Sequence, residues 1–147
     1  MKQRKNIALT ALFLSSAMLQ GCSGGDSADT AASAVSPEVF IVAPTNGASV
    51  NSPVTVEFGI RGYSLAPAGT QEEGTGHHHL LVDTPLPALD APIPADDNHI
   101  HFGKGQTSTT LELEPGDHTL QLLLGDGNHV PHSSPLISEQ ITITVVE

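Results

Sequence analysis

Several residue types are scarce in this sequence, and each scarcity excludes something. There is no tryptophan, and one tyrosine and four phenylalanines are the only aromatic residues apart from histidine, so any core is mainly aliphatic. Five lysines and arginines stand against sixteen acidic residues, which gives a formal net charge of −11. Without a basic patch the chain has no natural surface for nucleic acid. The hydrophobic fraction of 38% is nevertheless too high for a disordered acidic tail.

The single cysteine, Cys22, excludes an intramolecular disulfide. It follows a basic start and an apolar run, Ile7 to Met18, that is too short to span a bilayer as a permanent helix. The segment from Leu19 to Cys22 resembles the lipobox of bacterial lipoproteins, whose cysteine is lipidated before cleavage. We therefore interpret residues 1–21 as a lipoprotein signal peptide and Cys22 as the lipidation site. Residues 22–36, which are small and polar, are interpreted as a flexible tether.

The residue after the cysteine predicts the location. Ser23, in place of aspartate, indicates the outer membrane by the sorting rule of Gram-negative lipoproteins. We expect a cell-envelope protein that faces the periplasm and meets the membrane through its lipid anchor only. The sequence leaves open whether another envelope protein is a partner.

Residues 37–147 predict a single all-β domain. Gly, Pro and Asn interrupt the sequence at short intervals, and no amphipathic helix of useful length lies between them. This pattern is typical of an immunoglobulin-like antiparallel β-sandwich of six to eight short strands. The expected strands are Glu38 to Ala43, Val54 to Ile60, His77 to Val82, Thr109 to Leu113, His118 to Leu124 and Ile137 to Val146.

Histidine is unusually frequent for a chain of this length, with eight residues. All eight lie in one part of the sequence: His77, His78, His79, His99, His101, His118, His129 and His132. Strand alternation places His78 with the apolar Leu80, toward the core, and places His77 and His79 outward. His118 follows a tight Pro-Gly turn in a position like that of a tyrosine corner, so we expect its ring to bond backbone. His78 and His118 are thus predicted to be structural.

The other six histidines are candidate metal ligands: His77, His79, His99, His101, His129 and His132. Two His-x-His pairs and one His-x-x-His present imidazoles side by side, which suits copper or zinc. In an immunoglobulin-like sandwich, His129 and His132 would lie at the same end as His77 and His79. The position of His99 and His101 depends on the path of the Pro-rich stretch Thr84 to Asn98.

Two other functions use the same residues. In one, the domain is a structural or protein-interaction module whose imidazoles bond backbone or the carboxylates of Asp96, Asp97 and Asp126 and so order the loops. In the other, which the sequence favours less, it is a small copper oxidoreductase. We expect no enzyme and assign no catalytic residue, because Ser133 and Ser134 lie in no strand-to-helix elbow.

Several motifs resemble a known family. They are Ala66 to Gly69, Gly74 to Leu81, Ile93-Pro94, His99 to Thr107, Leu113 to Leu122 and His129 to His132. Together they closely resemble the bacterial domain-of-unknown-function family 4399, over about Phe58 to Ile143. The resemblance implies an exported envelope protein with a His-rich, sandwich-like domain. It implies no catalytic residue, so the metal-site hypothesis rests on spacing alone.

Overall fold

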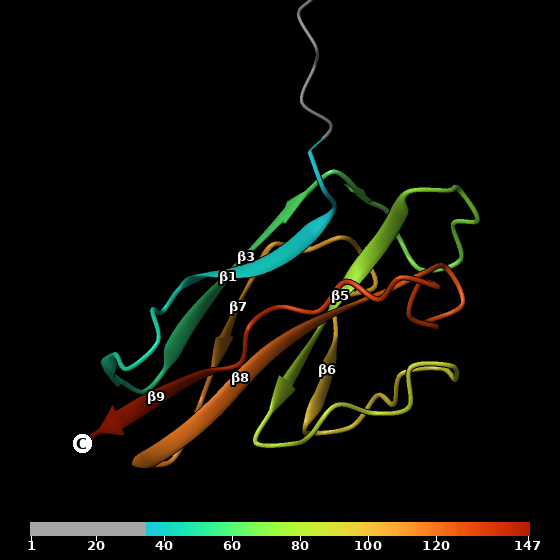
Figure 1. The fold of residues 1–147 in the computed structure, drawn as a ribbon. Coiled ribbons are helices and arrows are strands. Elements are labelled where there is room, and N and C mark those ends of the chain that lie inside the picture. The colour runs from blue at the N-terminus through green and yellow to red at the C-terminus, as the bar shows by residue number, and fades with distance from the viewer. Residues whose placement is uncertain (1–34) are drawn as a thin grey trace, which may run out of the picture. The chain divides into compact units, whose positions relative to one another are not determined.

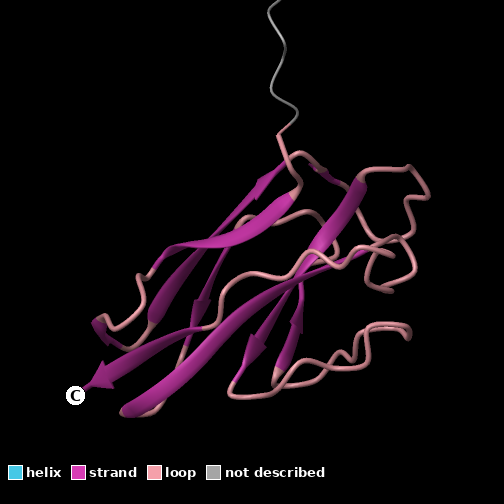
Figure 2. Ribbon diagram, in the orientation of Figure 1, coloured by secondary structure: helices cyan, strands magenta, loops and turns pink. Residues whose placement is uncertain are grey.

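The computed structural model describes residues 35–147. The predicted signal peptide, Cys22 and all but the last two residues of the predicted tether therefore lie outside the described residues. The described chain consists of strands and loops (Figure 2), and it contains no helix that is long and apolar enough to cross a membrane. Its strands are β1 (Glu38–Ala43), β2 (Ser49–Asn51), β3 (Val54–Arg61), β4 (Ser64–Leu65), β5 (Thr75–Val82), β6 (His99–His101), β7 (Ser108–Leu111), β8 (Gly116–Gly125) and β9 (Ile141–Val146).

These strands form two sheets (Figure 1). One has the order β1-β3-β7, and the other has the order β2-β9-β8-β5-β4, with β6 also paired to β5. Apart from the three shortest strands, β2, β4 and β6, one sheet consists of β1, β3 and β7 and the other of β5, β8 and β9. These six strands are arranged as in an immunoglobulin-like sandwich, except that the smaller sheet lacks one strand, the one that would come between β5 and β7 in the chain. The prediction of an all-β sandwich is confirmed.

Three details differ from the sequence prediction. The described residues form nine strands rather than six to eight, because β2, β4 and β6 are too short to show a period of two. Two pairings are parallel rather than antiparallel, namely β2 with β9 and β4 with β5. The last strand begins at Ile141 instead of Ile137. Ile137 forms only an isolated bridge with Leu123 of β8, and Ser138 bonds Leu122 through both its amide and its hydroxyl.

The main hydrophobic core lies between the two sheets. Leu80 and Val82 of β5 pack there with Leu120, Leu122 and Leu124 of β8, all of them buried, against side chains of β1, β3 and β7. The predicted alternation of β8 is therefore confirmed for these three leucines. Aliphatic side chains dominate this core, as the composition predicts, and two of the four phenylalanines, Phe58 and Phe102, are in it.

A second, smaller core covers the opposite face of the larger sheet. Leu81 of β5 and Leu123 of β8 pack there against Ile93, which lies in the long connection between β5 and β6, and Ile137 adds to the cluster. This connection and the loop that follows β8 lie on the side of the sheet away from β1, β3 and β7 (Figure 1). Both faces of β5 are thus covered, and all eight of its residues are buried. Because β5 is buried on both faces, it resembles a strand of a parallel sheet more than a strand of a surface hairpin.

Candidate metal centre

Strand β5 carries three consecutive histidines, and all three are fully buried. His78 points into the main core, where its ring centroid lies 5.4 Å from that of Phe58. His77 and His79 point to the opposite face, as strand alternation predicts. The prediction that this face is open to water is wrong: both side chains are 0% exposed, because the smaller core and further histidines cover them.

Strand β6 brings a third imidazole to this face. β6 runs antiparallel to β5 with His101 directly opposite His79 and His99 opposite Leu81. Ile100 and Phe102 turn toward the main core. Because residues directly opposite each other in a sheet lie side by side, this register places the His101 ring among the histidines of β5. Their ring centroids are 4.9 Å apart for His77 and His101 and 5.1 Å apart for His79 and His101.

The loop after β8 supplies the fourth imidazole, that of His129. Asp126 holds this loop through one carboxylate oxygen, which accepts hydrogen bonds from the amides of Asn128 at 2.8 Å and Val130 at 2.9 Å. The Asp126 carbonyl also accepts a bond from the His129 amide. Within this turn His129 adopts a φ of 67°, an uncommon conformation for a residue with a side chain. The Ile93 amide bonds the His129 carbonyl and ties the two long loops together.

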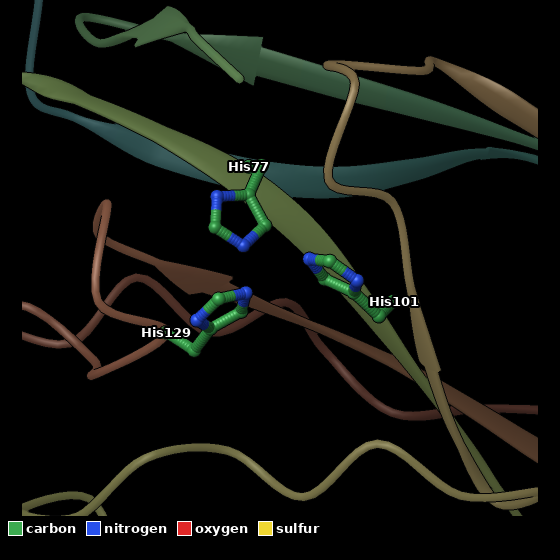
Figure 3. Close-up of side chains that lie close together, drawn as sticks. All are labelled: His77, His101 and His129. Atoms are coloured by element: carbon green, nitrogen blue, oxygen red, sulfur yellow. The ribbon is translucent and has the colours of Figure 1, made fainter. Parts of the chain in front are cut away.

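Three of these rings are gathered tightly enough to hold a metal ion. One ligand atom each of His77, His101 and His129 lies within 4.8 Å of the other two, and no other group in residues 35–147 is gathered in this way. Figure 3 shows the three rings facing a common space, each with a nitrogen turned toward it. The ring centroids of His77 and His129 lie 5.0 Å apart, and those of His101 and His129 lie 4.7 Å apart.

The nitrogens of the cluster lack hydrogen-bond partners. Both ring nitrogens of His77 and of His79, and Nε2 of His101, are buried and bond nothing in the structure. Buried polar groups are nearly always satisfied, so several orphaned imidazoles in one place call for a ligand. Nitrogen donors without carboxylate or sulfur suit copper and zinc, and these residues therefore fit such an ion.

Burial favours the neutral form of three rings in the cluster, those of His77, His79 and His101. Burial, reinforced by the neighbouring imidazoles His101 and His129, lowers the pKa of His77 to about 4, and burial lowers that of His79 to about 3. Burial also lowers the pKa of His101. A neutral imidazole has a free lone pair, which is the state that binds a metal. At neutral pH the rings of His77, His79 and His101 are therefore ready to act as ligands.

Two predicted ligands lie outside the cluster. The ring of His99 bonds Asp96, with 2.9 Å between Nδ1 and a carboxylate oxygen, because that aspartate lies three residues earlier in the same turn. His132 comes after Pro131, which forms an isolated bridge to Gly125, and its ring packs edge-on against Tyr63 at 5.0 Å. The expectation that His132 would join His77 and His129 is wrong, and His101 occupies that position.

His118 makes the contact that its corner position predicts. Its Nε2 lies 2.8 Å from the carbonyl of Glu114, and its Nδ1 lies 2.6 Å from the carboxylate of Asp83. The hydrogen bond with Asp83 raises the pKa of His118, in contrast to the clustered rings. This histidine therefore ties the end of β5 to the start of β8.

The sequence reasoning missed two glycines beside the rings. A β-carbon at Gly103 would lie 2.3 Å from Cε1 of His101, and one at Gly125 would lie 2.8 Å from Cε1 of His79. Only glycine leaves room for the rings at these positions. The sequence shows both glycines next to turns, where turn formation explains them equally well. The sequence offers Asp126 as a partner for an imidazole, whereas in the structure its carboxylate binds the loop backbone.

The fold and the cluster together define a histidine-rich β-sandwich domain. A family model, the domain of unknown function (DUF4399), matches residues 56–146, and the chain belongs to this family. The resemblance of its motifs is thereby confirmed. No curated protein and no solved structure matches the chain.

Proposed function

We propose that this domain binds one copper or zinc ion through His77, His101 and His129. The observation that carries the proposal is the set of buried imidazole nitrogens that bond nothing, gathered around a common space. A metal ion would satisfy one nitrogen of each of the three rings at once, since each ring contributes a lone pair. Asp126 lies near enough to His77 to raise its pKa, so it adds a favourable charge for a bound cation.

The alternative function, in which imidazoles only order the loops, applies to histidines outside the cluster. If imidazoles only ordered the loops, each ring would bond backbone or a carboxylate, as His99 and His118 do. The rings of His77 and His79 make no such bond, and Nε2 of His101 makes none either. The loop-ordering function therefore belongs to His99 and His118, and metal binding to the cluster.

Calorimetric titration with Cu(II) and with Zn(II) tests the proposal. The full chain should carry Cys22→Ala, so that no thiol competes for the metal. We expect one equivalent of at least one ion to bind with a Kd below about 10 µM, or more than about 7 kcal/mol of binding free energy. His129→Asn should weaken binding strongly, because asparagine tolerates the positive φ but removes the imidazole.

A matched control is His99→Asn, which removes an imidazole outside the cluster and should leave the affinity unchanged. The proposal is wrong if neither ion binds below about 10 µM, or if His129→Asn binds as tightly as the parent.

We propose in addition that the domain is held at the outer membrane, facing the periplasm, by lipid on Cys22. The support is in the sequence: the chain's one cysteine follows a basic start, an apolar run and the lipobox-like segment from Leu19. Cys22→Ala should abolish labelling by a clickable fatty acid. Unchanged labelling would contradict lipidation at this residue.

A further inference from the structure

A fourth imidazole, that of His79, lies beside the three that can share an ion. Its ring centroid is 4.9 Å from that of His77, 5.1 Å from that of His101 and 5.9 Å from that of His129. It is not among the three residues whose ligand atoms lie within 4.8 Å of one another. Binding of a fourth nitrogen would therefore require the His79 ring to move closer to the other three.

The ring of His79 has no other role in the structure. Its side chain is 0% exposed, and neither of its nitrogens has a hydrogen-bond partner. If only three residues held the ion, this ring would remain buried beside it with both nitrogens unsatisfied, which is a costly arrangement. Coordination removes that cost for one nitrogen.

The surrounding backbone is shaped to admit this ring. Gly125 of β8 lies opposite His77 in the ladder, and its missing side chain leaves space that the His79 ring fills. A β-carbon there would lie 3.2 Å from Nδ1 and 2.8 Å from Cε1 of His79. The ring is thus fixed beside the cluster by close packing rather than by hydrogen bonds.

The donors gathered in the cluster are all nitrogens. Residues 35–147 contain neither cysteine nor methionine, so no sulfur is at hand. The carboxylate of Asp126 already accepts two amide hydrogen bonds through one oxygen. Hard cations such as calcium and magnesium prefer oxygen ligands, and soft Cu(I) prefers sulfur, so the set suits a divalent ion such as Cu(II) or Zn(II).

We propose that His79 completes a closed site of four imidazoles around one divalent ion, with no position left for water or substrate. The inference rests on the proposed metal binding by His77, His101 and His129 and specifies its chemistry. Closed four-ligand sites hold a metal or stabilise a fold, whereas catalytic sites keep one position open. The site therefore stores or hands on its ion and does not activate water.

X-ray absorption on the zinc-loaded Cys22→Ala chain tests the coordination, and electron–nuclear double resonance on the Cu(II)-loaded chain in D2O tests for bound water. We expect four imidazoles and no exchangeable water. For His79→Gln we expect fewer imidazoles, a bound water and an affinity at least about tenfold lower. His132→Gln is the matched control, since its Nε2 is also buried and unpaired but outside the cluster.

Gly125→Ala should have the same effect as His79→Gln, because its methyl group displaces the ring. Even if these variants fold poorly, the spectra of the Cys22→Ala chain, whose histidines are unaltered, decide whether the site is closed. Three imidazoles and a bound water there would overturn the closed site while metal binding stands. Failure of both ions to bind would overturn the proposed function as well, so the two failures are distinguishable.

Discussion

At the scale of single residues, the histidines differ in what surrounds them. The ring of His118 meets a carboxylate, which raises its pKa. Burial and neighbouring imidazoles lower the pKa of His77 and His79, and at His77 the charge of Asp126 offsets only part of this. Burial disfavours the charged form, and a carboxylate at hydrogen-bond distance favours it. One residue type therefore supplies both a charged contact between strands and a set of neutral ligands.

The pair of His118 and Asp83 predicts a pH-dependent stability. Because the folded pKa of His118 is raised above 6.5, the folded state binds its proton more tightly than the unfolded state. The stabilisation is therefore complete below about pH 6.5 and is lost as the pH rises through the folded value. Asp83→Asn should lower the free energy of unfolding by about 1 kcal/mol near pH 6 and by less near pH 9.

Urea denaturation at the two pH values measures this difference. Asparagine tolerates the φ of 52° at this position and can still accept the amide of Thr119, so the variant isolates the charge. Asp97→Asn, at an exposed acid, serves as the control. An equal loss at both pH values would show that the ion pair contributes nothing.

At the scale of elements, the cluster is assembled by two strands and one loop that are far apart in the sequence. β5 and β6 fix their rings through ladder register, while His129 depends on a turn that Asp126 holds. Hydrogen bonds from backbone amides to a side chain, as at Asp126, take the place of strand pairing where a loop has a defined shape. The loop is therefore the element that is easiest to disturb without unfolding the sandwich.

Asp126→Ala should weaken metal binding by about tenfold or more, because two amides lose their acceptor and His129 is no longer held in place. Asp126→Asn keeps an accepting oxygen and should retain most of the affinity, which separates positioning from charge. Calorimetry gives the affinities, and circular dichroism checks that the strands persist. If the alanine variant binds as tightly as the parent, Asp126 does not position the loop.

At the scale of the whole domain, the candidate site lies on the side of the larger sheet that faces away from the main core. The smaller core of Leu81, Ile93 and Leu123 keeps that side dry, and the two long loops meet there through the bond between Ile93 and His129. An ion held at this place would link both strands and loops. Metal binding and folding should therefore be coupled.

Thermal unfolding measures that coupling. At a free ion concentration about a hundred times the Kd, mass action adds about 2.7 kcal/mol to the stability. For a domain of this size the Tm should rise by about 10 °C. The rise should be much smaller for His129→Asn. An unchanged Tm for the parent would favour the interaction-module alternative.

Prediction from sequence was most successful where local pattern decides the structure. β1 lies where it was expected, from Glu38 to Ala43, because the flanking prolines mark its limits. The opposite orientations of His78 and His79 also follow from the period of two. β6 and the other very short strands were missed, since two or three residues carry no period and form only because a longer strand lies beside them.

The sequence by itself determined the class of fold, the faces of β5 and the supply of imidazoles. Only the tertiary structure decided which imidazoles meet. His101 joins the cluster through its register with β5, whereas His132 is turned away beyond Pro131. Burial of the outer face was likewise decided by long-range packing of Ile93. The physical reason is that alternation is set by neighbouring residues, but coordination requires atoms from distant segments to lie within a few ångströms of one point.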